Sequence, residues 1–113
     1  MAIIVVMTKK VPFSLVYDPE VRNHLLAIEA KYRSLIRSTI EEQLRHEPDG
    51  ETRNRKPLEH PAPLGARWEL RLGPDNRFRI FYEVDVQARE VSILAIGVKE
   101  RSRLLIGGKE LTL

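Results

Sequence analysis

Cysteine is absent from the 113-residue sequence, which excludes disulfides, thiol nucleophiles and zinc sites with cysteine ligands. Long hydrophobic runs are absent as well. The N-terminal apolar run, residues 2–7, is far too short to span a bilayer, and no cationic stretch precedes it. We therefore expect a cytoplasmic protein with no signal peptide, no membrane anchor and no membrane partner.

Sequence motifs for metal or cofactor chemistry are also missing. The three histidines, His24, His46 and His60, lack the i,i+4 pairing or the carboxylate cluster expected of a metal site. The acidic residues form no cluster of the kind that two-metal phosphodiester hydrolysis needs, and no glycine-rich loop precedes a helix. We expect neither a metal nor a cofactor, so any nuclease chemistry would be metal-free.

What the sequence does contain is typical of one globular domain, which we assign to residues 1–113. Apolar residues make up 42% and charged residues 31%, as in ordinary folded proteins. The net charge of +3 is unevenly distributed, because residues 53–103 hold 11 Lys and Arg against 7 Asp and Glu. This asymmetry indicates either a polyanionic partner or a solvated basic surface.

The first half of the chain predicts strands followed by helix. Residues 3–7 and 13–17 are β-prone, and either run fits an edge strand. Asp18-Pro19-Glu20 is a helix-start signal, and Pro48-Asp49-Gly50 cannot continue a helix. Between them apolar residues recur at three- and four-residue steps, which fits a two-helix hairpin or one long kinked helix. Residues 51–65 contain three prolines and predict an irregular connection.

The second half predicts a three-stranded antiparallel meander, so the fold class is α+β. Residues 67–72 alternate charged and apolar side chains, and Gly73-Pro74-Asp75-Asn76 predicts a turn. In the next run Phe78, Ile80, Tyr82 and Val84 share one face that we expect to be buried. Residues 91–98 are almost continuously apolar, as in a central strand.

Strand parity predicts a cationic face on the meander. Arg67 and Arg71 share one side of their strand, and hairpin pairing would bring Arg77, Arg79 and Phe81 to the same face. Arginine forks suit phosphate oxygens, and an aromatic ring can stack on a base. The alternative is a solvated face whose arginines pair with Glu69 and Glu83, and strand parity alone does not choose between the two.

Two further groups of cations flank this face. One lies beyond the third strand, at every second residue, and the other precedes the proline-rich connection; they are Lys99, Arg101 and Arg103, and Arg53, Arg55 and Lys56. They extend the predicted binding surface for a polyanion.

The order of these elements and several short motifs resemble the RelE/ParE superfamily of toxins. The motifs are Arg55-Lys56-Pro57-Leu58, Trp68-Glu69-Leu70-Arg71, Arg77-Phe78-Arg79-Ile80-Phe81-Tyr82 and Gly97-Val98-Lys99-Glu100-Arg101, and the likeness covers residues 13–105. The resemblance implies a RelE/ParE-like fold with an N-terminal strand and a helical hairpin packed on one face of the sheet.

The resemblance also implies a function. RelE-type members cleave messenger RNA on the ribosome without a metal, and a cognate antitoxin silences them. Their ribose 2′-hydroxyl attacks the adjacent phosphate, and cationic side chains stabilise the transition state. By motif, Lys56, Arg71 and Arg79 fall at catalytic positions. RNA-binding positions would be Arg53, Arg55, Arg77, Phe81, Lys99, Arg101 and Arg103.

One departure from the family concerns the general base. RelE carries a functional tyrosine near the end of the chain, whereas this sequence has Leu104-Leu105-Ile106 and no tyrosine after Tyr82. Glu59 or His60 is a candidate substitute, and both also fit a plain loop surface. The departure keeps other functions open: a ParE-like inhibitor of DNA gyrase, a degenerate toxin that only binds its antitoxin, or a plain nucleic-acid-binding module.

Overall fold

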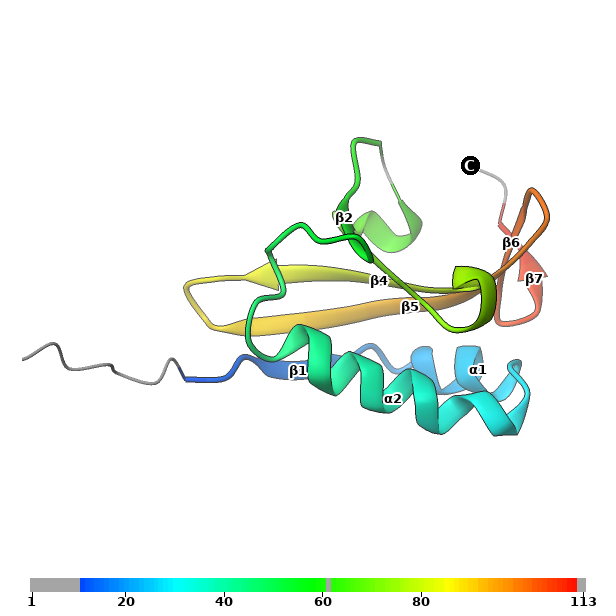
Figure 1. Ribbon diagram of the computed structural model, residues 1–113, viewed down its shortest axis with the longest axis horizontal. Helices are drawn as coiled ribbons and strands as arrows, with labels where there is room; N and C mark the ends of the chain where they lie inside the picture. Colours follow the sequence, from blue (N-terminus) through cyan, green and yellow to red (C-terminus); the bar gives the residue numbers. More distant parts are fainter. Residues whose placement is uncertain (1–10, 61, 112–113) are drawn as a thin grey trace, which may run out of the picture.

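The computed structural model describes residues 11–60 and 62–111. One sheet has the strand order β2-β3-β4-β5-β6-β7, with β1 also paired to β5, and both helices lie on one face of it (Figure 1). The α+β class, the N-terminal strand, the two helices and the antiparallel strands agree with the prediction. The predicted strand at residues 3–7 lies outside the described residues. The elements are β1 Ser14–Tyr17, α1 Val21–Leu26, α2 Ala30–Leu44, β2 Arg55–Pro57, β3 Trp68–Leu72, β4 Phe78–Asp85, β5 Glu90–Glu100, β6 Arg103–Ile106 and β7 Lys109–Glu110.

The helical region breaks between α1 and α2 although no Gly or Pro lies there. The break exposes the last carbonyls of α1, which need hydrogen-bond donors from elsewhere. Arg33 in α2 supplies them: its Nε donates to the oxygens of Leu25 and Ile28, at 2.9 and 3.0 Å, and its Nη2 to that of Leu26 at 3.1 Å. A side chain one turn into the next helix therefore decides between the two predicted arrangements in favour of two helices.

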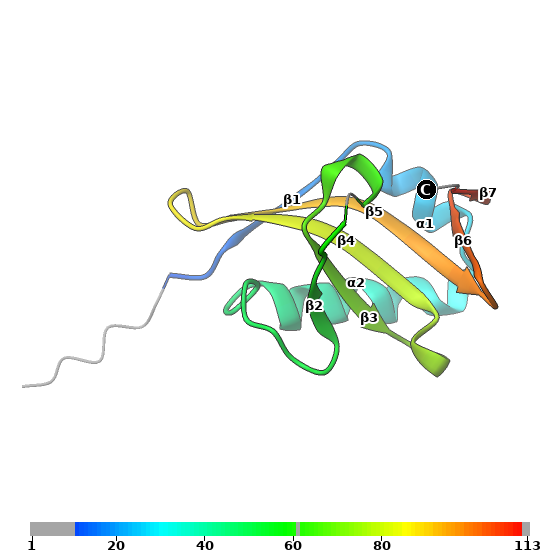
Figure 2. The ribbon, with the colours of Figure 1, turned by 90° about the horizontal axis from the view of Figure 1, so that it is seen from above.

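β5 organises the sheet, because its 11 residues are long enough to pair with three other strands. On one edge it pairs with β4, and on the other it pairs first with β1, in parallel, and then with β6 (Figure 2). The β4–β5 register shifts at Phe81/Tyr82, where Ile93 and Ala95 are successive partners and Leu94 is left over. Because of this bulge, odd-numbered residues of β5 face the main core before Leu94 and the even-numbered Ile96 faces it afterwards. The change of face explains why apolar residues follow one another without a break in the sequence.

Both faces of the sheet are covered, but unequally. The main core lies between the helices and the sheet, where Ile36, Ile40 and Leu44 of α2 meet the predicted face of β4, including Phe78, Ile80 and Tyr82. We call the opposite side the outer face. There a smaller cluster of Ala66, Phe81 and Ala95 is covered by Leu58 and Ala62 of the connection after β2 and by Leu104 and Ile106 of β6. No helix among the described residues is long and apolar enough to cross a membrane.

The prediction of a wholly irregular connection at residues 51–65 is wrong. Within it β2 pairs antiparallel with β3, and a short 3₁₀ turn, Pro63–Gly65, follows. The proline-rich sequence concealed β2, because a strand of three residues at a sheet edge tolerates Pro57 at its end. The consequence for the site is that β2 brings Lys56 alongside β3.

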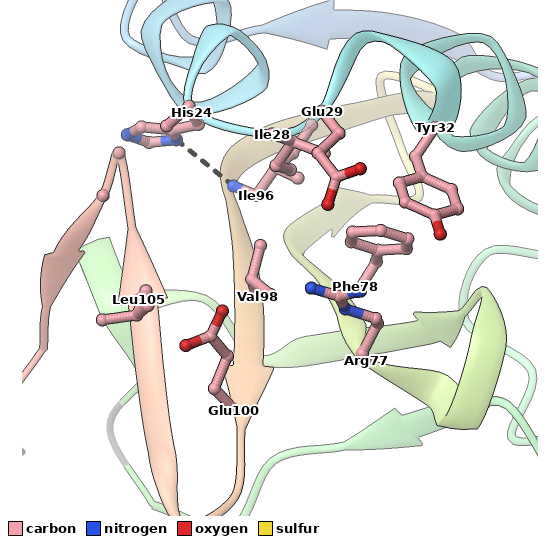
Figure 3. Close-up of a pocket in the computed structure, with 13 residues that line it drawn as sticks. His24, Ile28, Glu29, Tyr32, Arg77, Phe78, Ile96, Val98, Glu100 and Leu105 are labelled. Carbon is pink, nitrogen blue, oxygen red and sulfur yellow. Dashed lines mark hydrogen bonds between the residues drawn. The ribbon is translucent and has the colours of Figure 1, made fainter.

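His24 joins α1 to the centre of the sheet (Figure 3). Its Nδ1 accepts a hydrogen bond from the backbone N–H of Ile96 at 3.2 Å, which requires the neutral ring, and burial lowers the pKa of His24 against the opposing effect of Glu20 and Asp18. The unfolded chain therefore takes up a proton below pH 6.5 more readily than the folded protein does.

We therefore expect the contribution of His24 to the free energy of unfolding to be constant above about pH 6.5, the ordinary pKa of histidine. Below that pH the free energy of unfolding should fall as the pH drops. Urea denaturation at pH 7.5, 6.5, 5.5 and 5.0 measures the slope. His24→Gln, whose amide oxygen can accept the same hydrogen bond without titrating, should flatten it. An unchanged slope in that variant would assign the pH dependence to other groups.

Candidate nucleic-acid interface

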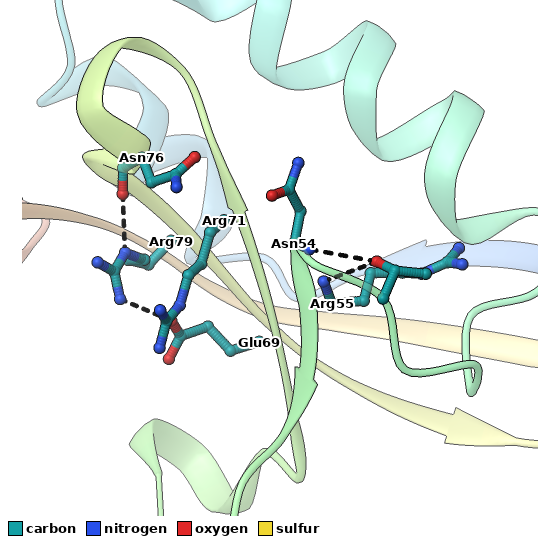
Figure 4. Close-up of polar contacts among 7 residues, drawn as sticks. Asn54, Arg55, Glu69, Arg71, Asn76 and Arg79 are labelled. Carbon is teal, nitrogen blue, oxygen red and sulfur yellow. Dashed lines mark hydrogen bonds and ion pairs between the residues drawn. The ribbon is translucent and has the colours of Figure 1, made fainter.

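Three charged side chains of the β3–β4 hairpin meet on the outer face (Figure 4). Arg71 and Arg79 are direct cross-strand partners, and Glu69 lies two residues before Arg71 on the same face. One carboxylate oxygen of Glu69 accepts from Arg71 Nε and from Arg79 Nη1, both at 2.7 Å. Arg79 Nε also donates to the oxygen of Asn76 at 2.9 Å. We call Glu69, Arg71 and Arg79 the Arg–Glu cluster.

Lys56 reaches the same face through β2. It is the cross-strand partner of Glu69, so its side chain leaves the sheet on the side of the Arg–Glu cluster. No ion pair of Lys56 within 4.0 Å is found among residues 11–60 and 62–111. The three residues predicted to be catalytic, Lys56, Arg71 and Arg79, are therefore neighbours around one buried carboxylate.

A groove of about 450 Å³ adjoins this cluster on the outer face. Phe81, Leu58 and Leu104 supply apolar lining, and Arg79 and Lys99 line it with positive charge. Glu59 and His60 line it as well, from the connection that follows β2. The two candidate substitutes for the missing tyrosine thus lie in the same groove as two of the predicted cations, Arg79 and Lys99.

A second hollow, of about 640 Å³, shares Arg79 and Lys99 with the groove. It also contains Arg77, Arg101, Asp75 and Glu100. Six cationic residues line or adjoin the two hollows: Lys56, Arg71, Arg77, Arg79, Lys99 and Arg101. Four carboxylates do so as well: Glu59, Glu69, Asp75 and Glu100. The surplus of positive charge is therefore modest, and any preference for a polyanion depends on geometry.

Two of the predicted RNA-binding residues on the β3–β4 hairpin lie differently from expectation. Phe81 is only 4% exposed and belongs to the small outer-face cluster, so its ring is part of the groove wall and not an open stacking platform. Arg77 precedes β4 and has helical backbone angles, which breaks the strand alternation. Its guanidinium lies 5.4 Å from the centre of the Phe78 ring and 5.9 Å from that of Tyr32 on α2, at the helix side of the hairpin end.

The cations predicted to flank this face differ in exposure and in the face of the sheet to which they point. Arg55 is 7% exposed and donates from Nη1 to the oxygen of Gln43 at 2.7 Å, so it ties β2 to the end of α2 and is not available to RNA. Arg53 is exposed in the loop before it. Lys99 pairs with Leu104 and Arg103 pairs with Glu100, so Lys99 and Arg103 leave opposite faces. A two-residue turn, Arg101 and Ser102, interrupts the expected alternation.

None of the three tyrosines lines the outer-face groove. Tyr82 is fully buried, donates to the oxygen of Pro48 at 2.7 Å and has a pKa raised well above its usual range by burial. Tyr32 packs at a tilt of 52° against Phe78 on the helix side, with ring centres 5.1 Å apart. Tyr17 lines a separate groove between β1 and the helices. An acid or base acting in the outer-face groove must therefore be another group.

In the described part of the chain, no three His, Asp or Glu side chains lie together in a way that could hold a metal ion. Metal-free chemistry stays a prediction. Strand parity did not predict that Glu69 bridges Arg71 and Arg79. From the sequence it was expected only as an ion-pair partner on a solvated face. The pattern Glu-x-Arg on one strand, opposite Arg on the next, is the signal that predicts such a bridge.

No family model and no curated protein matches this sequence. Among solved structures, one match is a chain of the crystal structure of the toxin–antitoxin complex RelBE2 from Mycobacterium tuberculosis. The TM-score is 0.63 and the identity 22%, over 79% of this chain and 100% of that chain. At this identity the likeness concerns the fold alone. The chain has the α+β fold of a RelE-like toxin.

Proposed function

We propose that this protein is the toxin of a type II toxin–antitoxin pair and cleaves messenger RNA on the ribosome without a metal. The observation that carries the proposal is the grouping of Lys56, Arg71 and Arg79 on the outer face, beside a groove that also holds Glu59 and His60. A solvated basic face does not require cations and candidate bases to converge on one groove.

The proposed reaction is an internal transfer. The ribose 2′-hydroxyl gives its proton to Glu59 or His60 while its oxygen attacks the adjacent phosphorus. The bond from phosphorus to the 5′-oxygen breaks, and that oxygen takes up a proton, so the products are a 2′,3′-cyclic phosphate and a 5′-hydroxyl. Arg71 and Arg79 would stabilise the charge that develops on the phosphorane oxygens, and Lys56 would contact phosphate.

Purified ribosomes carrying a defined mRNA test the proposal. Cleavage in the presence of EDTA, with cyclic phosphate ends, would support it. An mRNA that stays intact under these conditions and in expressing cells would reject it.

An antitoxin partner follows from the same proposal. The matched solved structure is a toxin–antitoxin complex. Exposed apolar side chains on this chain, Val16 and Tyr17 of β1 and Leu26 and Leu35 of the helices, offer a surface for a helix or an extended segment. Acidic residues of the antitoxin would face the outer-face cations. Co-expression of the product of the neighbouring reading frame should relieve toxicity, and persistent toxicity with a confirmed complex would contradict silencing by this route.

The second candidate is a non-enzymatic inhibitor, either of DNA gyrase in the manner of ParE or an inactive chain that only binds its antitoxin. The observation that favours it is the placement of all three tyrosines away from the groove. A supercoiling assay separates the alternatives: inhibited gyrase with intact mRNA supports the first form, and harmless expression with tight antitoxin binding supports the second.

Arg101 provides a test of RNA contact that leaves the fold intact. Its φ of +57° places it in the left-handed region at the β5–β6 turn, a conformation that costs a non-glycine residue about 1–2 kcal/mol. Arg101→Gly should therefore keep the free energy of unfolding within about 1 kcal/mol of wild type, because relief at the turn offsets added chain entropy. Affinity for programmed ribosomes should fall and its salt dependence should weaken. Unchanged affinity at every salt concentration would remove Arg101 from the interface.

A further inference from the structure

We infer that Glu69 is a positioning residue, which holds the guanidinium groups of Arg71 and Arg79 in place for the reacting phosphate. The inference rests on the proposed RNA cleavage and assigns to Glu69, which lines the outer-face groove, a role that it performs through the two arginines. Glu69 is 7% exposed, and a single carboxylate oxygen receives both arginines. One of its two carboxylate oxygens is thus used by both cations, and the residue is largely shielded from solvent.

The need for such a residue follows from strand register. Arg71 and Arg79 are direct cross-strand partners, and like charges in this arrangement repel each other. A carboxylate two residues away on the same face offsets that repulsion and draws both side chains toward one point. Without this carboxylate, we expect the two guanidinium groups to move apart. A bound phosphate would then have to order both side chains at each turnover.

The hydrogen bonds also decide which arginine nitrogens stay available. Arg79 uses Nε for the oxygen of Asn76 and Nη1 for Glu69, so two of its three nitrogens are fixed and Nη2 remains for a ligand. Arg71 uses Nε for Glu69 and keeps both terminal nitrogens. Arg79 is the more enclosed of the two, with a side chain 13% exposed against 40% for Arg71. A guanidinium fixed in this way loses little entropy when a phosphate binds.

A role in positioning and a role in charge balance predict opposite results for Glu69→Gln. Removing a negative charge beside a phosphate site strengthens ground-state attraction, whereas the weaker hydrogen bonds of a neutral amide oxygen hold the arginines less firmly and weaken stabilisation of the transition state. We expect the affinity for ribosomes carrying an mRNA that is 2′-O-methylated at the cleavage site to stay equal or rise up to about threefold. We expect the single-turnover cleavage rate to fall by about 10- to 100-fold. A rate within about twofold of wild type would overturn the inference.

Glu69→Asp keeps the charge and moves the carboxylate back by one methylene. Positioning predicts a slower cleavage rate with unchanged affinity, while a role limited to charge balance predicts wild-type behaviour in both measurements. The two variants together keep the inference testable if one of them folds poorly, and thermal melting of each identifies such a case.

Arginine Nε–H resonances separate failure of this inference from failure of the proposed function. In ¹⁵N-labelled wild-type protein, the Nε–H groups of Arg71 and Arg79 should exchange slowly with solvent, and in Glu69→Leu, which has no acceptor atom, the exchange of Arg71 should rise by at least about tenfold. Arg33, whose Nε donates to Leu25 and Ile28, is the internal control and should not change. If wild type cleaves no mRNA, the proposed function fails, and these resonances still decide whether Glu69 orders the two arginines. Unchanged exchange at Arg71 would overturn the inference whatever the activity.

Discussion

Replacement of Arg79 by alanine is expected to lower the rate of mRNA cleavage by about 10²- to 10³-fold, the usual cost of removing one preorganised donor to a developing oxyanion. Arg79 lines both the outer-face groove and the second hollow, and it is held there by Glu69 and the oxygen of Asn76. Affinity for the uncleaved complex should fall much less, because Lys56, Arg71 and Lys99 remain. Mapping of transcript ends in cells and single-turnover cleavage on programmed ribosomes measure the two quantities.

The matched control is Arg37→Ala, which removes an exposed arginine from α2 on the opposite side of the sheet. It should leave the cleavage rate unchanged, and alanine suits the helix. Arg79→Lys, which keeps the charge but loses the planar fork, should lie between Arg79→Ala and wild type. Equal rates for Arg79→Ala and Arg37→Ala would contradict a catalytic role for the outer face.

Ile40→Ala is expected to have the largest effect on stability, a loss of about 2–5 kcal/mol in the free energy of unfolding. Ile40 is fully buried at the centre of α2, between Ile36 and Leu44 and against the sheet. Its truncation removes buried apolar surface and leaves a cavity, since the rigid β4–β5 pair limits relaxation. Urea denaturation should show a lower midpoint with an unchanged slope.

Leu35→Ala on the same helix is the control, because Leu35 is 43% exposed. Its effect should stay within about 0.5 kcal/mol. Similar losses for the two variants would mean that α2 is not seated on the sheet by the face that contains Ile40. Cleavage by Leu35→Ala should match wild type, whereas a weaker complex with the antitoxin would locate the partner on this surface.

Most of the fold was readable from the sequence because its signals are local. The end of the helical region before Pro48, the alternation of β3 and the buried face of β4 depend on periodicity and turn residues; the structure has all three, although α2 already ends at Leu44. Strands β6 and β7 were not predicted, and three further features escaped for physical reasons. The break between α1 and α2 depends on Arg33 donating to carbonyls five to eight residues away. β2 is too short to show a period, and the bulge at Leu94 leaves no mark in a continuous apolar run.

The candidate site was predictable as far as regular strand pairing extends. Arg71 and Arg79 do face each other across the hairpin. Alternation failed where a turn replaced a strand, so Arg77 lies at the helix side and Arg103 leaves the face opposite to Lys99. It also failed for Phe81 and Arg55, because parity gives the direction of a side chain but not what covers it.

The sequence by itself determined the α+β class, the order of the N-terminal strand, the helices and the three longer strands, and the shared face of Arg71 and Arg79, because each follows from local period and turn chemistry. Only the tertiary structure decided which charges meet. Lys56, Glu59 and His60 approach the Arg–Glu cluster through the short strand β2 and the connection after it, which no local pattern encodes. The same packing turned Arg55 inward and placed the tyrosines away from the groove. The sequence thus predicts a basic face. Tertiary packing decides which few side chains of that face lie close enough together to act on one phosphate.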